Sequence, residues 1–404
     1  MGEVLSIDAP GRVSLAEEKT PGVPEGGFRV VTAYSGVSAG TELTYVKGDN
    51  PYLGAAWDPA LGLFLPGTPS VDYPVRGIGY MQVGEVVETR TRAVRVGARV
   101  AMTYGHRTEY VADPLKDRFV ELPDDLDPLL GVYVAHMGPI CANGLLHAAA
   151  DLHGAAVRDL GDGVRGRRVA VVGAGVVGLV TASFALAHGA AEVVVVDETP
   201  SRLEVAAALG AGGVGAADLG AGAPGDQEDP AVELKRRWRH GPDDRGADVV
   251  FQCRGRTRAL ALGLRLLRPQ GTLIDLAFYT EGAREVRLGE EFHHNGLSLR
   301  CAQIGRVPRG LAHAWDRERL SYETIALLRE RGSLLREHLV TDVADFADAP
   351  RLLTDLAARR RHTLQAVLRH DASRALRHDS PGSPGVLRHD SPGVLRHDVD
   401  DERR

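Results

Sequence analysis

The feature that most constrains the fold is one stretch, RVAVVGAGVVGLVTASFALAHGAAEVVVVDETPSR, at residues 168–202. A valine-rich strand runs directly into Gly173-x-Gly175-x-x-Gly178, which opens an apolar helix, and a second valine run ends at Asp197. In such a pattern the first glycine permits a tight turn, the second lets a ligand approach the backbone, and the third allows close helix–strand packing. The stretch therefore predicts two parallel strands joined by a crossover helix.

The same stretch predicts a dinucleotide site, because the free N–H groups at a helix N-terminus bind phosphates. The predicted phosphate-binding residues are Gly173, Gly175, Val176, Val177 and Gly178. Asp197 lies at the distance expected of an acid that binds the adenosine ribose, and Arg202 lies in the same region. A carboxylate there repels a 2′-phosphate and Glu198 adds to the repulsion, so NAD is expected rather than NADP. The alternative is a glycine-rich packing turn with a helix-capping aspartate.

The rest of the chain divides into a β-rich part and an alternating part. Short strands broken by glycine and proline fill the first ~150 residues, which is typical of an all-β, barrel-like domain. They are expected at residues 28–37, 80–90, 99–104, 108–113 and 118–123. Strands and helices then alternate from about residue 144, as in a parallel sheet. The predicted class is α/β, with helices at 320–335 and 348–360 near the end.

Two segments have a composition that does not favour packing. Residues 210–229 are rich in glycine and alanine and are expected to form a mobile surface excursion. The end of the chain repeats Leu-Arg-His-Asp with Ser-Pro-Gly spacers. Such polar low-complexity sequence buries little apolar area, so a disordered tail is predicted rather than a metal site on its histidines.

Composition excludes several classes of partner. The net charge of −6 argues against nucleic acid, which needs a basic face. The cysteines Cys141, Cys253 and Cys301 are far apart and form no CxxC pair, which indicates a reducing, cytoplasmic protein. The N-terminus has no apolar signal-peptide region, and no apolar run approaches the roughly 20 residues that span a bilayer. Neither export nor membrane insertion is expected.

Several stretches resemble a known family: YSGVSAGTEL, GIGYMQVGEVVE, GADVVFQCRG, LRPQGTLIDLAF and DFADAPRLLTDL. With the nucleotide loop they resemble the medium-chain dehydrogenase/reductase superfamily, which contains zinc alcohol and polyol dehydrogenases and zinc-free relatives. The resemblance implies a GroES-like β-barrel catalytic domain and a Rossmann doubly wound parallel-sheet domain. It places them at residues 1–149 and 150–292, with 293–368 returning to the catalytic domain and 369–404 as the tail.

The resemblance also indicates that catalytic zinc is absent. Zinc members usually carry Cys-Gly-x-Cys-Gly-Thr-Asp, and Ser38 stands where the ligating second cysteine would be. Tyr80 occupies the position of the next ligand, a histidine, and the third aligns with Pro139 or Ile140, with Cys141 out of register. A hydroxyl is a poor zinc ligand beside a thiolate. The nearest pattern is that of zinc-free relatives resembling bacteriochlorophyllide side-chain alcohol dehydrogenases.

Without zinc, another group must exchange the proton of an alcohol. Tyr80 stands at the ligand-histidine position, Glu42 at that of the acid contacting this histidine, and Thr41 at the start of the family's proton relay. We therefore expect Glu42 to orient Tyr80 as the acid or base, with Ser38 beside them. The alternative is that Tyr80 fills a gap and Glu42 is a structural acid. The remaining candidates are His136 for catalysis and Asn143, Arg254, Leu276 and Phe278 for the cofactor.

The expected function is that of an NAD-dependent oxidoreductase acting on a secondary alcohol or ketone, such as a polyol, cyclitol or specialised-metabolite intermediate. A zinc-free enone or quinone reductase is one alternative, although such enzymes usually favour NADPH. A cofactor-binding protein without turnover is the other. Residues 297–305 read as the last strand of the nucleotide sheet, and relatives pair that strand across a two-fold axis, so a homodimer is expected.

Overall fold

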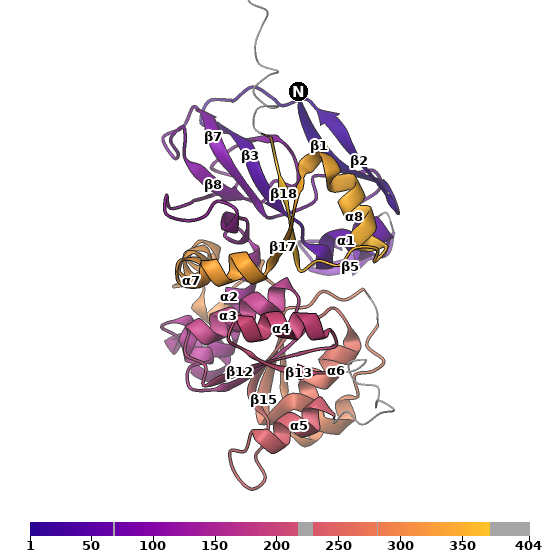
Figure 1. The fold of residues 1–404 in the computed structure, drawn as a ribbon, viewed down its shortest axis with the longest axis vertical. Helices are drawn as coiled ribbons and strands as arrows, with labels where there is room; N and C mark the ends of the chain where they lie inside the picture. The colour runs from indigo at the N-terminus through magenta and orange to yellow at the C-terminus, as the bar shows by residue number, and fades with distance from the viewer. Residues whose placement is uncertain (68, 217–228, 281, 372–404) are drawn as a thin grey trace, which may run out of the picture.

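The computed structural model describes residues 1–67, 69–216, 229–280 and 282–371, which form two lobes stacked along the long axis (Figure 1). Residues 372–404, most of the predicted tail, lie outside the described residues, as do 217–228 of the predicted excursion. Within the described ranges, no helix is both long enough and apolar enough to cross a membrane.

The upper lobe is built on mainly antiparallel sheets, in which β17 and β18 pair in parallel. Its main sheet has the order β10-β8-β7-β3-β18-β17, with β9 also pairing with β3, and a smaller sheet has the order β2-β1-β6. The strands are β1 (Gly2–Ala9), β2 (Arg12–Glu18), β3 (Phe28–Gly36), β6 (Val75–Arg76), β7 (Gln82–Thr89), β8 (Arg99–Met102), β9 (Glu109–Ala112), β10 (Val120–Glu121), β17 (Val340–Asp345) and β18 (Gln365–Arg369). The predicted barrel-like strands are thus present.

The lower lobe is a six-stranded parallel sheet of order β13-β12-β11-β14-β15-β16. The strands are β11 (Arg168–Val172), β12 (Glu192–Asp197), β13 (Gly212–Gly215), β14 (Ala247–Gln252), β15 (Leu267–Asp275) and β16 (Ser298–Cys301). The valines of β11 and β12 are buried, as expected of strands covered on both faces. In chain order this is the Rossmann arrangement, which reverses between β11 and β14 and leaves a crevice at their carboxyl ends.

Helices cover the sheets and join the lobes. They are α1 (Ala39–Lys47), α2 (Met137–His153), α3 (Val176–Ala187), α4 (Pro200–Ala208), α5 (Pro230–Arg237), α6 (Thr257–Leu266), α7 (Arg317–His338) and α8 (Ala349–Ala357). After α7 the chain returns to the upper lobe, where β18 pairs with β3 (Figure 1). The parallel sheet itself runs to Cys301, past the predicted boundary at 292; the other predicted boundaries stay predictions.

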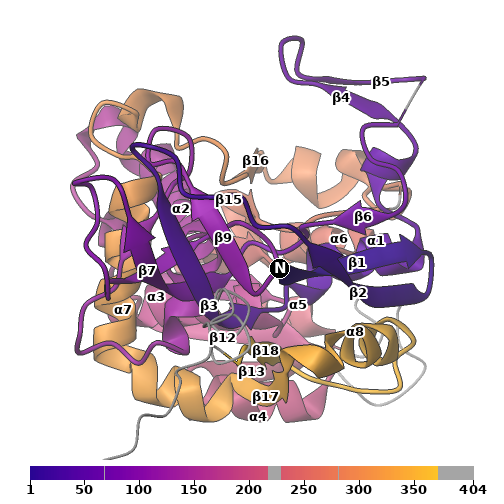
Figure 2. The same ribbon diagram turned by 90° about the horizontal axis from the view of Figure 1, so that it is seen from above.

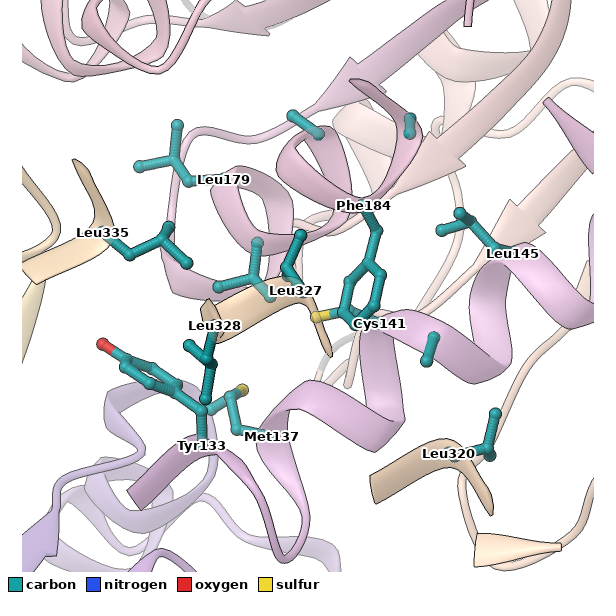
Figure 3. Close-up of a cluster of buried hydrophobic side chains, with 14 of the residues drawn as sticks. Tyr133, Met137, Cys141, Leu145, Leu179, Phe184, Leu320, Leu327, Leu328 and Leu335 are labelled. Atoms are coloured by element: carbon teal, nitrogen blue, oxygen red, sulfur yellow. The ribbon is translucent and has the colours of Figure 1, made fainter. Parts of the chain in front are cut away.

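The largest apolar cluster ties the lobes together through α2, α3 and α7. Figure 3 shows Cys141 and Leu145 of α2 beside Phe184 of α3 and Leu327 of α7. All four side chains are buried. Because α2 and α7 also pack on each other, this cluster packs the lower lobe against the upper lobe.

Several elements were not anticipated. Residues 39–47, quoted above only for their chemistry, form α1. A hairpin of β4 (Ala56–Asp58) and β5 (Leu63–Leu65) projects from the upper lobe (Figure 2). Residues 212–215, predicted to be part of a mobile excursion, are the edge strand β13, because they pair with β12.

Candidate active site

A cleft of about 490 Å³ is walled by residues of both lobes. Helix α1 and Tyr80 of the upper lobe line it on one side of the lobe boundary, and the ends of β11, β14 and β15 of the lower lobe line it on the other. The predicted residues that line it are Ser38, Thr41, Tyr80, Gly175, Val176, Val177, Arg202, Arg254, Leu276 and Phe278. The fold therefore brings the predicted catalytic hydroxyls and the predicted cofactor residues to one place.

The predicted phosphate loop, residues 173–178, has the geometry that its glycines predict. Gly173 has a φ of 102°, a conformation that other residues rarely adopt. A Cβ on Gly178 would lie 1.8 Å from the carbonyl oxygen of Gly173, so helix α3 can pack here only with glycine. A Cβ on Gly175 would meet nothing within 4 Å, and Gly175 lines the cleft directly before the first turn of α3. This cradle fits a pyrophosphate at a helix N-terminus.

Asp197 ends β12, as predicted, and its carboxylate is bonded within the chain. Its side chain is buried, with 1% exposure, and both carboxylate oxygens have partners in the chain. The N–H of Ala174 donates to Oδ2 and the N–H of Thr199 donates to Oδ1, each over 2.8 Å. Asp197 therefore holds the phosphate loop to the end of β12. The exposed acid at this position is Glu198, and Arg254 Nη2 donates to it over 2.5 Å.

The cleft has an excess of positive charge. Against a single acid, Asp49, its described lining includes the cations Lys47, Arg202, Arg254, Arg256 and Arg359. Such an excess favours an anionic ligand, because low-dielectric walls strengthen the field inside a cleft. A dinucleotide with its pyrophosphate is an anion of this kind.

Three hydroxyl groups, those of Ser38, Thr41 and Tyr80, form a cluster at the start of α1. Helix α1 begins after Ser38 and ends at Gly48, which adopts the left-handed conformation. Ser38 Oγ hydrogen-bonds the phenol oxygen of Tyr80, and Thr41 Oγ1 lies 3.5 Å from the same oxygen. Burial raises the pKa of Tyr80 above its usual 10. At neutral pH this phenol is therefore protonated and can act as a proton donor.

Glu42 stands behind this cluster and contacts it through the backbone. Its Oε1 accepts from the N–H of Ser38 over 2.8 Å, and its Oε2 lies 2.9 Å from His106 Nε2. His106 Nδ1 is 2.8 Å from Ser35 Oγ, which is 2.9 Å from His370 Nε2. The expected direct contact to Tyr80 is thus replaced by one through Ser38, since both oxygens of Glu42 are engaged elsewhere.

The sequence did not indicate a place in the site for His106 or His370. Both are buried, and they come from separate segments that meet only when β18 pairs with β3. No spacing in the sequence links them to Glu42.

His136 and Asn143 lie beside the cleft rather than in its wall. The ring of His136 packs against that of Tyr80, with 4.5 Å between the ring centroids. Arg317 Nη2 donates to Nδ1 of His136 over 2.6 Å. Burial, helped by Arg317 and Arg118, lowers the pKa of His136 to about 3, so it is neutral. Asn143 is fully buried and donates to backbone carbonyls of residues 302–306. These contacts tie α2 to the segment after β16, and a cofactor role for Asn143 stays a prediction.

The positions that hold zinc in relatives have unsuitable donors here. Ser38 and Tyr80 offer hydroxyl oxygens that bond each other. The thiol of Cys141 is buried in the apolar cluster of Figure 3 and donates to the carbonyl of Val177 over 3.4 Å. Burial raises its pKa to about 12, whereas zinc binds the thiolate. Among the described residues, no three His, Cys, Asp or Glu side chains are grouped to hold a metal ion.

Comparisons with known proteins agree with this architecture. The family described as "Zinc-binding dehydrogenase" matches residues 176–316. D-guloside 3-dehydrogenase of Escherichia coli is 25% identical over 354 residues, which are 86% of this chain and 93% of that protein. The chain belongs to the medium-chain dehydrogenase/reductase superfamily.

Other members of this superfamily extend the comparison. Probable D-xylulose reductase A of Arthroderma otae is 27% identical over 324 residues, covering 75% of this chain and 82% of that protein. The crystal structure of galactitol-1-phosphate dehydrogenase from Escherichia coli superposes with a TM-score of 0.68 at 17% identity. It covers 91% of this chain and 99% of that one, and it supports the two-domain fold. The homologues are dehydrogenases, so the protein is of an oxidoreductase family.

Proposed function

We propose that this protein is an NAD-linked oxidoreductase that transfers a hydride between nicotinamide and a secondary alcohol or its ketone without zinc. The observation that carries the proposal is the shared cleft, which is lined both by the phosphate loop and by the hydroxyl cluster of Ser38, Thr41 and Tyr80. A bound nicotinamide would supply or accept the hydride. The chain must then bind the dinucleotide, orient the substrate and move one proton.

Binding of the dinucleotide is assigned to the lower lobe. Gly175, Val176 and Val177 present the start of α3 to the pyrophosphate. Leu276 and Phe278, at the end of β15, give the cleft an apolar wall for a flat ring. Glu198 is the exposed acid at the ribose position and favours NAD over NADP.

Proton transfer is assigned to Tyr80. In ketone reduction the phenol donates its proton to the oxygen that becomes the alcohol, while the hydride goes to the carbon. Ser38 Oγ, already hydrogen-bonded to the phenol oxygen, can donate a hydrogen bond to the phenolate that forms, and the phenolate regains its proton from solvent in the cleft. The raised pKa of Tyr80 keeps the phenol protonated at neutral pH, the state in which it can donate a proton during ketone reduction. Glu42 positions Ser38 through its backbone N–H.

The substrate is proposed to be polyhydroxylated. A second cavity of about 510 Å³ shares Thr41 and Tyr80 with the cleft and has the polar side chains of Tyr45, Ser70, Asp72 and Arg76 in its walls. Such walls can hydrogen-bond several hydroxyl groups. The names of the relatives, D-guloside 3-dehydrogenase and D-xylulose reductase, are also those of enzymes acting on sugars or sugar derivatives.

The test is a panel of secondary alcohols, polyols, sugars and ketones with both cofactors, followed by nicotinamide absorbance. We expect turnover of a polyhydroxylated alcohol or ketone, and its loss in Gly175→Asp, which places a carboxylate where the pyrophosphate binds. Gly289→Asp is the matched control, because it adds the same charge at an exposed glycine with equal space. Cofactor binding without turnover would favour a non-catalytic protein, and reduction of enones alone would favour the reductase alternative.

A further inference from the structure

Arg254 crosses from one strand end of the nucleotide sheet to the next. It follows β14, and its backbone lies against the phosphate loop, where a Cβ on Gly173 would meet Arg254 Cβ at 2.9 Å. Its guanidinium reaches the end of β12, with Nη2 at 2.5 Å from Glu198 and Nη1 at 3.7 Å from Asp197 Oδ2. The Arg254 guanidinium therefore lies beside Asp197 and Glu198, at the position where this fold usually binds the adenosine ribose.

The charges around this point do not form a simple acidic site. Asp197 is buried and already accepts from two backbone N–H groups, so it presents little to a ligand. Glu198 is paired with Arg254. Arg202 also lines the cleft, and its side chain has no ion-pair partner among the described residues. A 2′-phosphate arriving here would meet two guanidinium groups as well as the carboxylates.

We infer that Arg254 sets the difference in binding affinity between NAD and NADP. Its guanidinium offsets the charge of Asp197 and Glu198, and it can donate hydrogen bonds to a 2′-phosphate. This inference rests on the proposed function. Discrimination is the difference between two binding free energies. The acids weaken NADP binding, and the guanidinium restores part of it, because a planar guanidinium pairs well with phosphate. The wild-type protein therefore prefers NAD by a small margin and accepts both cofactors.

The experiment compares dissociation constants of NADH and NADPH, measured by fluorescence titration. Arg254→Met keeps the length of the side chain and removes its charge. We expect the NADPH-to-NADH ratio of dissociation constants to rise about 10- to 100-fold, the range for one hydrogen bond to a charged group. Glu198→Gln, at an exposed side chain, should lower the ratio, because it removes a repelling charge and frees Arg254. Both effects should shrink in high salt, which screens exposed charges.

The control is Arg300→Met, which removes the same charge from an arginine paired with Asp151 and absent from the cleft lining. It should leave the ratio unchanged. A ratio in Arg254→Met within about twofold of wild type, or an equal shift in the control, would overturn the inference while leaving the proposed function intact. Failure of the wild-type protein to bind either cofactor would overturn both. A ratio that does not fall in Glu198→Gln would also count against the inference.

Discussion

Replacing Tyr80 with phenylalanine is the most direct test of the proton-transfer assignment. The substitution removes the phenol oxygen, which bonds Ser38 Oγ and lies 3.5 Å from Thr41 Oγ1. The aromatic ring at position 80, whose centroid lies 4.5 Å from that of His136, remains. The free energy of unfolding should therefore fall by only about 1–3 kcal/mol, the cost of leaving Ser38 Oγ without this partner.

Turnover should fall much more than stability. A positioned acid or base contributes roughly 10²–10⁴-fold to the rate. At about 1.4 kcal/mol per factor of ten, this range corresponds to about 2.7–5.5 kcal/mol of barrier. Binding of NADH should change little, because the phosphate loop and the ends of β14 and β15 are untouched.

The assay measures turnover with the best ketone, the NADH dissociation constant and a thermal melt on each variant. Tyr73→Phe is the matched control, because it removes a phenol oxygen of the same lobe that donates to the carbonyl of Tyr45 over 2.6 Å, outside the cleft lining. Ser38→Ala should lower turnover less than Tyr80→Phe. The double variant should lose less than the sum of the two, because residues acting as a unit are non-additive.

An active Tyr80→Phe would refute the assignment. The tyrosine would then be a packing residue, and the hydroxyls of Ser38 and Thr41 would have to act without it. Equal losses of turnover in Tyr80→Phe and Tyr73→Phe would refute it as well, since they would indicate a general effect of removing a hydroxyl.

Three further predictions follow from the structure. Glu42→Gln should lower the free energy of unfolding by about 1–3 kcal/mol in denaturant titrations, because an amide has only one acceptor oxygen for the buried contacts to Ser38 N–H and His106; unchanged stability would contradict this. Burial lowers the pKa of His370 from 6.5 to about 3, so only the unfolded state takes up a proton below pH 6.5, and stability present above that pH should fall by up to about 1.4 kcal/mol per unit toward pH 3. The decline should be shallower in His370→Asn. Light scattering should give a dimer mass, because β16 is an edge strand with Leu299 exposed; a monomer at micromolar concentration would contradict it.

Local sequence determined the strand–loop–helix–strand unit of residues 168–197. The valines of β11 and β12 suit strands buried on both faces, and Gly173 and Gly178 are required by the turn and by the packing of α3. These preferences act within a few residues, so strand, loop, helix and strand could be assigned with boundaries close to those observed.

Side-chain partners could not be read in the same way. The position of Asp197 at the end of β12 was predicted, but no sequence pattern indicated that the N–H groups of Ala174 and Thr199 would hydrogen-bond its carboxylate. Helix α1 was also missed, because its nine residues mix strong helix formers such as Ala39 and Leu43 with weak ones such as Gly40.

Only the tertiary structure decided the network behind the hydroxyl cluster of Ser38, Thr41 and Tyr80. Ser35 meets His106 and His370 across separations of 71 and 335 residues, because β3 pairs with β18 after the chain has built the nucleotide lobe and returned. Arg254 likewise meets Glu198 only because parallel strands bring their carboxyl ends to one edge of the sheet. Sequence patterns report preferences between near neighbours, whereas a buried carboxylate or guanidinium takes whichever partner the packed fold places within reach.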